Sequence, residues 1–222
     1  MKWNSLISWV RASTNPTILR IRAAVLTAVR KKALRTAEAA AAEEIAARLK
    51  VYANHFYVLW DGARPVAFID GMTTDEQDLR DEMYADASLH DAQGAWQMIF
   101  GLNTLPEYRR RGCAGRLIEA LCAAAQEQGR RGVVLTCKEK LVPYYAKFGF
   151  ADEGVSQSAH GGVVWHQMRR TFRVRWPGPY STLRRLRKAQ ADAMLNGKGG
   201  TRKCRIIMLR GAPSADCGRN ES

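Results

Sequence analysis

Hydrophobic positions in the central part of the chain predict a strand, a helix and a second strand. Apolar residues recur at helical spacing from Ala114 to Ala125, which predicts an amphipathic helix over residues 114–128. Apolar runs of strand length lie before and after it, over residues 99–105 and 133–137. Two strands joined through a helix are expected to lie parallel, in a right-handed crossover.

The remaining segments predict a sheet with helices on its faces. Residues 57–60 and 65–71 alternate as strands around a tight turn at Asp61 and Gly62. The other expected elements are a strand over residues 18–24, helices over 25–35, 38–49 and 141–148, and strands over 150–155 and 162–168. An insertion over residues 72–97 separates the hairpin from the next strand. This order predicts an α/β (α+β) chain with a mixed, mostly antiparallel central sheet.

The turn between residues 105 and 114 is the strongest candidate for a binding site. It places Gly112 and Gly115 where a strand turns into a helix, beside three consecutive arginines. Free N–H groups and the positive end of the helix dipole make such a helix start an anion site, and phosphate is its natural occupant. The structural alternative is that the glycines only relieve a tight turn and that the arginines are solvated. Neither G-x-x-x-x-G-K-[ST] nor G-x-G-x-x-G occurs, so nucleotide loops of those kinds are not supported.

Two motifs resemble a known superfamily. Arg109, Gly112 and Ala114 fit [Q/R]-x-x-G-x-[G/A], the pyrophosphate loop of the GNAT superfamily of acyl-CoA-dependent N-acetyltransferases. The run Leu-Val-Pro-Tyr-Tyr-Ala-Lys-Phe-Gly-Phe over residues 141–150 resembles its second hallmark segment, and is most similar to the arylalkylamine (serotonin-type) branch. The Val-Ala-Phe-Ile strand over residues 66–69 is similar to the third strand of that branch. The resemblance extends from about residue 18 to residue 168.

The resemblance implies direct transfer of an acetyl group from acetyl-CoA to an amine. Tyr145 occupies the family position of the general acid that protonates the CoA thiolate. Acetyl-CoA is the implied cosubstrate, and no metal is implied. The implied cofactor-binding residues are Leu102, Asn103, Thr104, Arg109, Arg110, Arg111, Gly112, Cys113, Ala114, Gly115 and Arg116. Tyr144 and Tyr145 are neighbours on one short helix, so core packing with a satisfied hydroxyl is the alternative role for either of them.

The sequence departs from the arylalkylamine pattern at the general base. That branch carries two histidines on the strand before the pyrophosphate loop, and Met98 and Phe100 stand at those positions here. His160 and Glu139 are the candidate bases on this chain. A water chain to bulk solvent, or an amine of low pKa, is the alternative. Residues 31–40 also lack the aromatic and proline-containing loop of that branch, so the acceptor does not follow from the resemblance.

Net charge divides the chain into three parts. Residues 1–50 carry +7, residues 51–170 carry −2 and residues 171–222 carry +9, which accounts for the net charge of +14. We predict an N-terminal extension over 1–16, an acetyltransferase domain over 17–170 and a basic C-terminal extension over 171–222. Residues 205–210 have strand character without an evident partner. The extension is expected to be a solvated appendage, and contact with nucleic acid or anionic lipid is its alternative role.

Acidic residues gather in the insertion. Residues 70–91 carry eight acids against Arg80 alone. Beside an acceptor site such a segment would attract a small amine or a basic peptide, and solubility is the alternative explanation.

The five cysteines lack C-x-x-C spacing and no apolar stretch approaches membrane-spanning length, so we expect a cytoplasmic protein. Two other functional classes stay open. One is a non-catalytic acyl-CoA-binding relative, and the other is a nucleic-acid or ribosome-associated protein that acts through its basic flanks.

Overall fold

The computed structural model describes residues 26–29, 42–158, 162–172 and 205–208. Its helices are α3 (Ala42–Tyr52), α4 (Glu82–Ala85), α5 (Cys113–Glu127) and α6 (Val142–Ala146). Its strands are β1 (Tyr57–Asp61), β2 (Arg64–Asp70), β3 (Thr73–Thr74), β4 (Trp96–Ile99), β5 (Gly101–Thr104), β6 (Gly132–Cys137), β7 (Ala151–Val155), β8 (His166–Thr171) and β9 (Arg205–Met208). Residues 26–29 are helical. The predicted strand over 18–24 lies outside the described residues.

The strands form two hydrogen-bonded sheets. One has the order β5-β2-β1-β9 and the other the order β3-β4-β6-β8-β7. Two backbone hydrogen bonds join these sheets where they meet. Phe100 N donates to Asp70 O and Met98 N donates to Met72 O, both at 2.8 Å. Among the strands that the structure describes, β4 and β6 pair in parallel and the other pairs are antiparallel. The predicted mixed, mostly antiparallel sheet is therefore confirmed.

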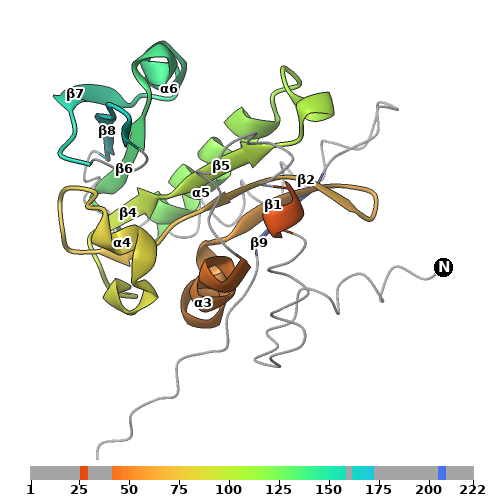
Figure 1. The fold of residues 1–222 in the computed structure, drawn as a ribbon, viewed down its shortest axis with the longest axis horizontal. Coiled ribbons are helices and arrows are strands. Elements are labelled where there is room, and N and C mark those ends of the chain that lie inside the picture. Colours follow the sequence, from red (N-terminus) through yellow and green to blue (C-terminus); the bar gives the residue numbers. More distant parts are fainter. Residues whose placement is uncertain (1–25, 30–41, 159–161, 173–204, 209–222) are drawn as a thin grey trace, which may run out of the picture.

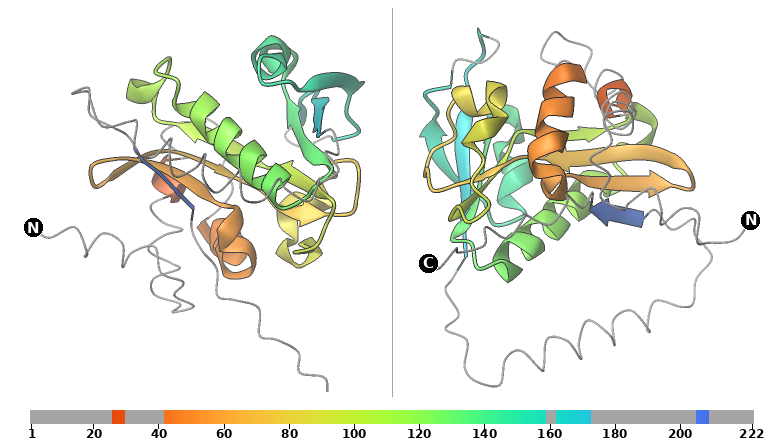
Figure 2. Two further views of the ribbon diagram at one scale, coloured as in Figure 1. Left: turned by 180° about the vertical axis from the view of Figure 1, so that it is seen from behind. Right: turned by 90° about the horizontal axis from the view of Figure 1, so that it is seen from below.

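Helices cover both faces of this sheet. Figure 2 shows α3 on one face of β1 and β2 and α5 on the other. The apolar stripe of α5 is buried against the strands through Leu117, Ile118 and Leu121. On the other face, Ile45, Leu49 and Tyr52 of α3 are fully buried or nearly so. Burial of these apolar side chains provides most of the free energy that holds the two helices on the sheet, about 25 cal/mol for each Å² of apolar surface removed from water.

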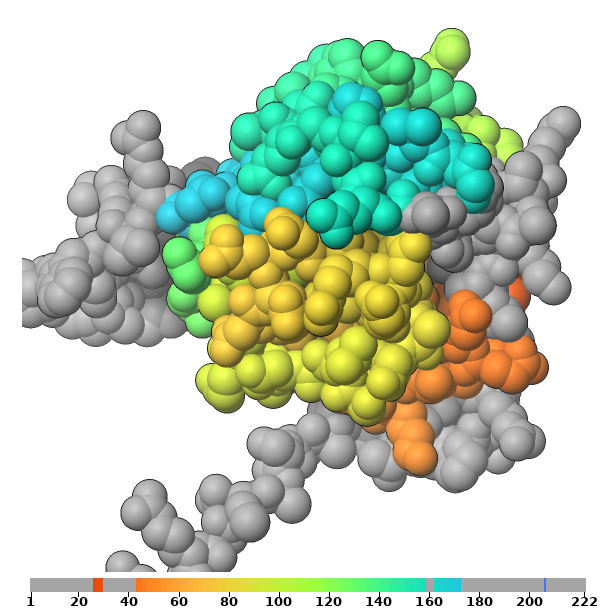
Figure 3. All heavy atoms as spheres, turned by 60° about the vertical axis from the view of Figure 1, so that its left-hand side comes forward, coloured from red at the N-terminus to blue at the C-terminus, as the bar shows by residue number. Residues whose placement is uncertain are grey.

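Three predicted elements differ in the structure. The strand expected over 99–105 is two strands, β4 and β5, which separate at Phe100 because each pairs with a different neighbour. The last strand begins at His166 rather than at residue 162. The insertion contains β3 and α4, and Figure 3 shows it in yellow, packed side by side with β7 and β8.

The strand over residues 205–208 has a partner, contrary to the prediction. β9 pairs antiparallel with β1, from Tyr57 opposite Met208 to Trp60 opposite Arg205. Ile206 is half-buried against the core. A strand with open backbone groups is stabilised wherever a sheet edge is available, and β1 supplies one.

Candidate active site

Two neighbouring strands separate at the centre of the sheet. β4 runs parallel to β6 as far as the pair Ile99 and Leu135. The chain then turns at Phe100, and β5 pairs with β2 instead. Figure 1 shows β5 and β6 diverging from this point, which we call the fork. Within the described strands β5 is an edge strand, so one side of its backbone is open for hydrogen bonds to a ligand. The implied residues Leu102, Asn103 and Thr104 all lie on this strand.

The predicted anion site lies at the end of β5. Gly112 is the N-cap of α5 with φ of 75°, and no side chain caps the helix. A Cβ at Gly112 would meet nothing within 4 Å, so the left-handed backbone, rather than lack of space, favours glycine here. Gly112 therefore offers no side-chain acceptor to the first turn of α5, and the helix dipole adds positive potential there.

The arginines of the loop lie at the surface. Arg109, Arg110 and Arg111 are exposed, and Arg116 on the first turns of α5 is exposed as well. The Arg111 guanidinium lies 5.3 Å from the ring centroid of Tyr108, which gives a cation–π contact. Cys113 is buried instead, so its side chain faces the core rather than the loop surface. Anion binding at this loop would thus depend on backbone groups first and on arginine charge second.

The segment that follows α6 lies against the first turn of α5. A Cβ at Gly115 would lie 3.0 Å from the Phe148 ring, so glycine lets the two segments approach closely. Phe148 in turn packs edge-on against Tyr144, with ring centroids 5.3 Å apart. The structure thereby brings together the glycine loop and the segment that carries Tyr145.

Tyr145 is buried, with 8 % of its surface exposed. Its ring packs edge-on against Tyr144 and Phe150, at centroid distances of 5.3 Å and 6.1 Å. Burial raises the pKa of Tyr145 well above its ordinary value, and nearby Cys137 and Tyr144 raise it further. Tyr145 therefore keeps its phenolic proton at neutral pH, as a proton donor must.

Of the two candidate bases, the structure describes only Glu139. Glu139 is exposed in the 3-10 turn before α6. His160 lies outside the described residues. Met98 and Phe100, at the positions of the two family histidines, are both buried in the core.

A buried ion pair, absent from the sequence analysis, lies beside the fork. Arg48 of α3 donates from Nη1 to Asp70 Oδ2 at 3.0 Å, and from Nη2 to the carbonyl of Tyr84 at 2.7 Å. Its guanidinium also lies 5.0 Å from the Phe100 ring centroid. The sequence carried one signal for this pair: Arg48 interrupts the apolar stripe formed by Ile45, Leu49 and Tyr52.

Two hydroxyls, from the insertion and from β6, lie close together at the fork. Tyr84 OH lies 3.1 Å from Thr136 Oγ1, and Thr136 is the first residue of β6 beyond the last pair with β4. The Tyr84 ring packs on Phe100 at 4.8 Å. Burial raises the pKa of Tyr84, so this hydroxyl is neutral at physiological pH. Polar groups at the fork thus come from the insertion and from β6, which are distant in the sequence.

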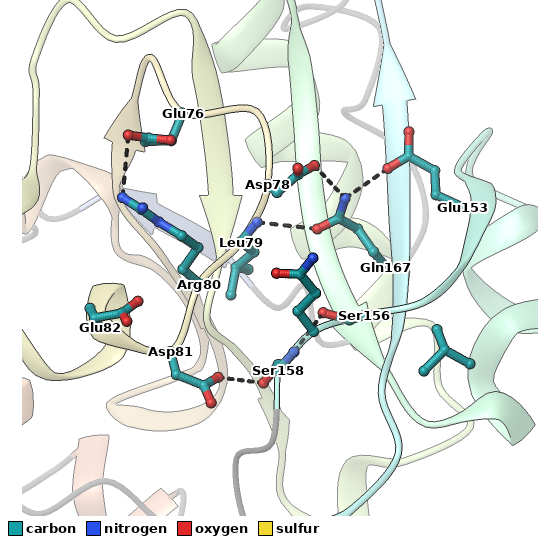
Figure 4. A pocket seen from close by; sticks show the side chains of 12 residues that line it. Glu76, Asp78, Leu79, Arg80, Asp81, Glu82, Glu153, Ser156, Ser158 and Gln167 are labelled. Atoms are coloured by element: carbon teal, nitrogen blue, oxygen red, sulfur yellow. Dashed lines mark hydrogen bonds and ion pairs between the residues drawn. The ribbon is translucent and has the colours of Figure 1, made fainter.

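A pocket of about 410 Å³ opens between the insertion and the strands β7 and β8. Acidic side chains dominate its wall, as Figure 4 shows: Glu76, Asp78, Asp81, Glu82 and Glu153, with Arg80 as the basic member. Several of these acids already have partners. Arg169 binds Asp78 and Glu153, and Ser158 donates to Asp81.

The negative potential predicted for residues 70–91 is therefore weaker than their formal charge. Asp70 is buried and paired with Arg48, so it does not face solvent, and Arg169 offsets part of the charge of the pocket.

Two classes of site receive no support from the described part of the chain. No group of three or more metal-ligating side chains occurs in it. None of the helices described above is long and apolar enough to cross a membrane.

Comparison with known proteins agrees with this geometry. Residues 25–172 match the acetyltransferase (GNAT) domain family, and the chain belongs to that family. Membership of the family supports acyl transfer as the general class of activity.

Solved structures share the fold at low identity. The GNAT-like decarboxylase GphF, solved with isobutyryl-CoA, superimposes with a TM-score of 0.60 at 17% identity and covers 69% of this chain and 96% of its own. The loading GNATL domain of CurA from Lyngbya majuscula gives 0.60 at 16%, covering 68% and 94%. Ard1 from Thermoplasma volcanium gives 0.53 at 17%, covering 68% and 93%. These similarities establish the fold, and the fold alone does not select the acceptor.

Proposed function

We propose that this chain transfers the acetyl group of acetyl-CoA directly to an amine, with Tyr145 as the general acid. One observation carries the proposal. The start of α5, whose N-cap is Gly112, and the segment that carries Tyr145 are joined by the contact of Gly115 with Phe148, next to the open edge of β5. A phosphate site, an extended backbone edge and a buried proton donor are the parts that a thioester donor requires.

Each part has a separate task in this proposal. The N–H groups of residues 112–115 bind the pyrophosphate of acetyl-CoA. The open edge of β5 binds the pantetheine arm through backbone hydrogen bonds, and one of its N–H groups polarises the thioester carbonyl. Tyr145 then gives its proton to the CoA thiolate as the C–S bond breaks.

The acceptor is a small amine or a basic peptide. The acidic pocket between the insertion and β7 supports a cationic acceptor, because a negative wall concentrates cations near it. The Val-Pro-Tyr-Tyr resemblance to the arylalkylamine branch supports an amine, although the acceptor-side residues of that branch have no equivalent over residues 31–40.

Calorimetric titration with acetyl-CoA tests the donor site. Gly112→Asp should abolish saturable 1:1 binding, because it puts a carboxylate against the pyrophosphate. Gly62→Asp is a matched control, since Gly62 also has a positive φ, 59°, and open space at its Cβ, but lies in the hairpin turn between β1 and β2. Equal affinity in the wild type and Gly112→Asp would contradict the loop assignment.

Turnover tests the amine. CoA release should depend on 2-phenylethylamine, spermidine or a lysine peptide when each is added with acetyl-CoA. Tight binding of acetyl-CoA with no release of CoA on any of the three would favour a non-catalytic acyl-CoA-binding protein.

A further inference from the structure

Two side chains of β8 hold the insertion against the sheet. Arg169 donates two hydrogen bonds to Glu153 of β7, from Nε to Oε1 at 2.6 Å and from Nη2 to Oε2 at 3.0 Å. Its guanidinium also donates to Asp78 Oδ1 at 2.9 Å and to the carbonyl of Gln77 at 2.7 Å, both in the insertion. The Arg169 side chain is 12 % exposed and lies 4.7 Å from the ring centroid of Trp96 in β4. One largely buried cation therefore joins β4, β7 and the insertion.

Gln167 extends this contact two residues earlier, on the same face of β8. Its Nε2 donates to Asp78 Oδ1 at 2.7 Å and to Glu153 Oε2 at 2.9 Å, as Figure 4 shows. Its Oε1 accepts a hydrogen bond from the backbone N–H of Leu79 at 3.1 Å. We call these two side chains and the residues that they bind the clamp: Arg169, Gln167, Glu153 and residues 77–79.

The part of the insertion that the clamp binds has no regular structure of its own. Residues 75–81 form neither helix nor strand, and of residues 75–80 only Leu79 is buried. A segment without a ladder of backbone hydrogen bonds takes its position from the groups that bind it. Because α4 begins directly afterwards, at Glu82, the clamp helps to determine where α4 lies.

The helix α4 carries the residue that reaches the fork. The Tyr84 ring packs on Phe100, and the Tyr84 hydroxyl lies 3.1 Å from Thr136 Oγ1. Gln167 lies opposite Thr136 in the register of β6 and β8, and neighbouring strands are about 4.8 Å apart. Gln167 also lines the acidic pocket. The clamp thus borders both the fork and the pocket that supports the acceptor in the proposed function.

The face of the sheet that carries the clamp is separate from the donor side. Met168 stands between the two clamp residues and alternates to the opposite face, where its sulfur lies 3.6 Å from Cys137 Sγ. Cys137 in turn is near Tyr145. Substitutions in the clamp should therefore act on the acceptor side first.

We propose that Arg169 and Gln167 are positioning residues for the acceptor. They hold the insertion where Tyr84 and the acidic wall can contact the amine, and they determine acceptor affinity without touching the reacting atoms. The inference rests on the proposed function and deepens it on the acceptor side.

Charge and position predict opposite effects for Arg169. The acidic pocket attracts a cationic acceptor, and Arg169 offsets part of that attraction by pairing with Asp78 and Glu153. By charge alone, loss of the guanidinium would lower the acceptor KM. Through the clamp, the same loss releases residues 77–79 and raises the KM. The direction of the change separates the two effects.

Steady-state kinetics at saturating acetyl-CoA measures that direction. The acceptor is whichever of 2-phenylethylamine, spermidine and a lysine peptide gives the highest kcat/KM with the wild type. Arg169→Gln should raise its KM about 10-fold, keep kcat within about threefold and leave the calorimetric affinity for acetyl-CoA unchanged. Arg169→Lys keeps the charge, but one ammonium cannot reproduce the planar set of donors, so the KM should rise here too.

Two further variants separate the clamp from charge. Gln167→Leu removes the hydrogen bond to Leu79 at constant charge, so it should raise the KM by about threefold or more. Arg80→Gln is the matched control, because Arg80 lines the same pocket and pairs with Glu76 inside the insertion. It removes the same charge without a clamp bond and should lower the KM of the cationic acceptor.

Hydrogen exchange gives a readout that needs no turnover. The Leu79 amide should be protected in the wild type and should exchange about 10-fold faster or more in Arg169→Gln, whereas the amides of α5 should keep their wild-type rates. A local change of this kind distinguishes release of the insertion from damage to the whole fold.

Three outcomes overturn the proposal. The first is a KM that falls or stays constant in Arg169→Gln, which means that charge outweighs position. The second is a KM that rises as much in Arg80→Gln as in Arg169→Gln. The third is an equal loss of acetyl-CoA affinity, which indicates a general structural role.

Gln167→Leu carries the test if Arg169→Gln does not fold. Failure of the proposed function looks different, because the wild type would then release no CoA with any of the three acceptors. Exchange at Leu79 would still report whether Arg169 holds the insertion.

Discussion

At the scale of single residues, burial decides which groups can donate or accept protons. Tyr145 is held among Tyr144, Phe150 and the nearby Cys137, and the raised pKa that results keeps its proton in place at neutral pH, where it is available to a departing thiolate. Tyr144 is more exposed and packs on Phe148, so its ring matters more than its hydroxyl. The sequence alone ranked the two tyrosines only through family resemblance.

Removal of the two hydroxyls in turn should separate their roles. Tyr145→Phe should lower kcat by roughly 10² to 10⁴ and leave acetyl-CoA affinity unchanged, because the lost group acts only on the departing thiolate. Tyr144→Phe, one position away on the same helix, should retain wild-type kcat within about threefold. Steady-state kinetics with calorimetry measures both. Equal rates for Tyr145→Phe and wild type would show that Tyr145 has only a packing role.

At the scale of elements, local patterns predicted most segments correctly. The β1–β2 hairpin, α5 and α6 lie where periodicity and turn residues placed them, because each is determined by neighbours within a few positions. The break at Phe100 could not be predicted in this way. The residues on both sides of it favour an extended chain. The fork arises because the residues before Phe100 pair with β6, whereas those after it pair with β2.

Contact between α5 and the segment after α6 gives a prediction at this scale. Gly115→Leu should push Phe148 away and displace α6 from the start of α5, which should weaken acetyl-CoA binding by about 10-fold or more, about 1.4 kcal/mol. Phe148→Ala combined with Gly115→Leu restores volume, so the double variant should recover much of the affinity. Calorimetry measures the acetyl-CoA affinity of the wild type, Gly115→Leu and the double variant, and unfolding curves confirm that each protein is folded. Simple additivity of the two substitutions would show that the contact is unimportant.

At the scale of the whole molecule, distant segments are joined by buried polar groups. The His55 ring lies 2.7 Å from Gln97 Oε1, while the Gln97 amide donates to the carbonyls of Met72 and Met98. His55 must then donate from Nδ1, because the amide oxygen can only accept. Burial lowers the pKa of His55 to about 4, and also lowers that of His90, 5.1 Å away, to about 4.

The free energy of unfolding should therefore fall in mild acid. Between pH 6.5 and about 4, His55 and His90 bind protons in the unfolded chain but stay neutral in the folded protein. The free energy of unfolding therefore falls as the pH falls through this window. Above pH 6.5 these two histidines do not change it. The slope for one such proton approaches about 1.4 kcal/mol per pH unit. Urea unfolding at pH 7 and pH 5 measures it.

A pair of variants assigns this loss of stability to the buried ring. His55→Gln should reduce the difference in unfolding free energy between pH 7 and pH 5, whereas His166→Gln, at the sheet surface beside Asp152, should not. An undiminished difference in His55→Gln would mean that other groups cause the acid sensitivity.

The sequence by itself determined the elements and their family. Short-range periodicity, turn glycines and two motifs were enough for the hairpin, the Gly112 loop, α5 and the Tyr145 helix, since the forces that form them act between residues close in the chain. The tertiary structure alone decided the fork at Phe100, the partner of β9, and the pairing of Arg48 with Asp70. Those features depend on which distant strand or charge competes successfully for one open edge or one buried polar atom, and no local pattern contains that information.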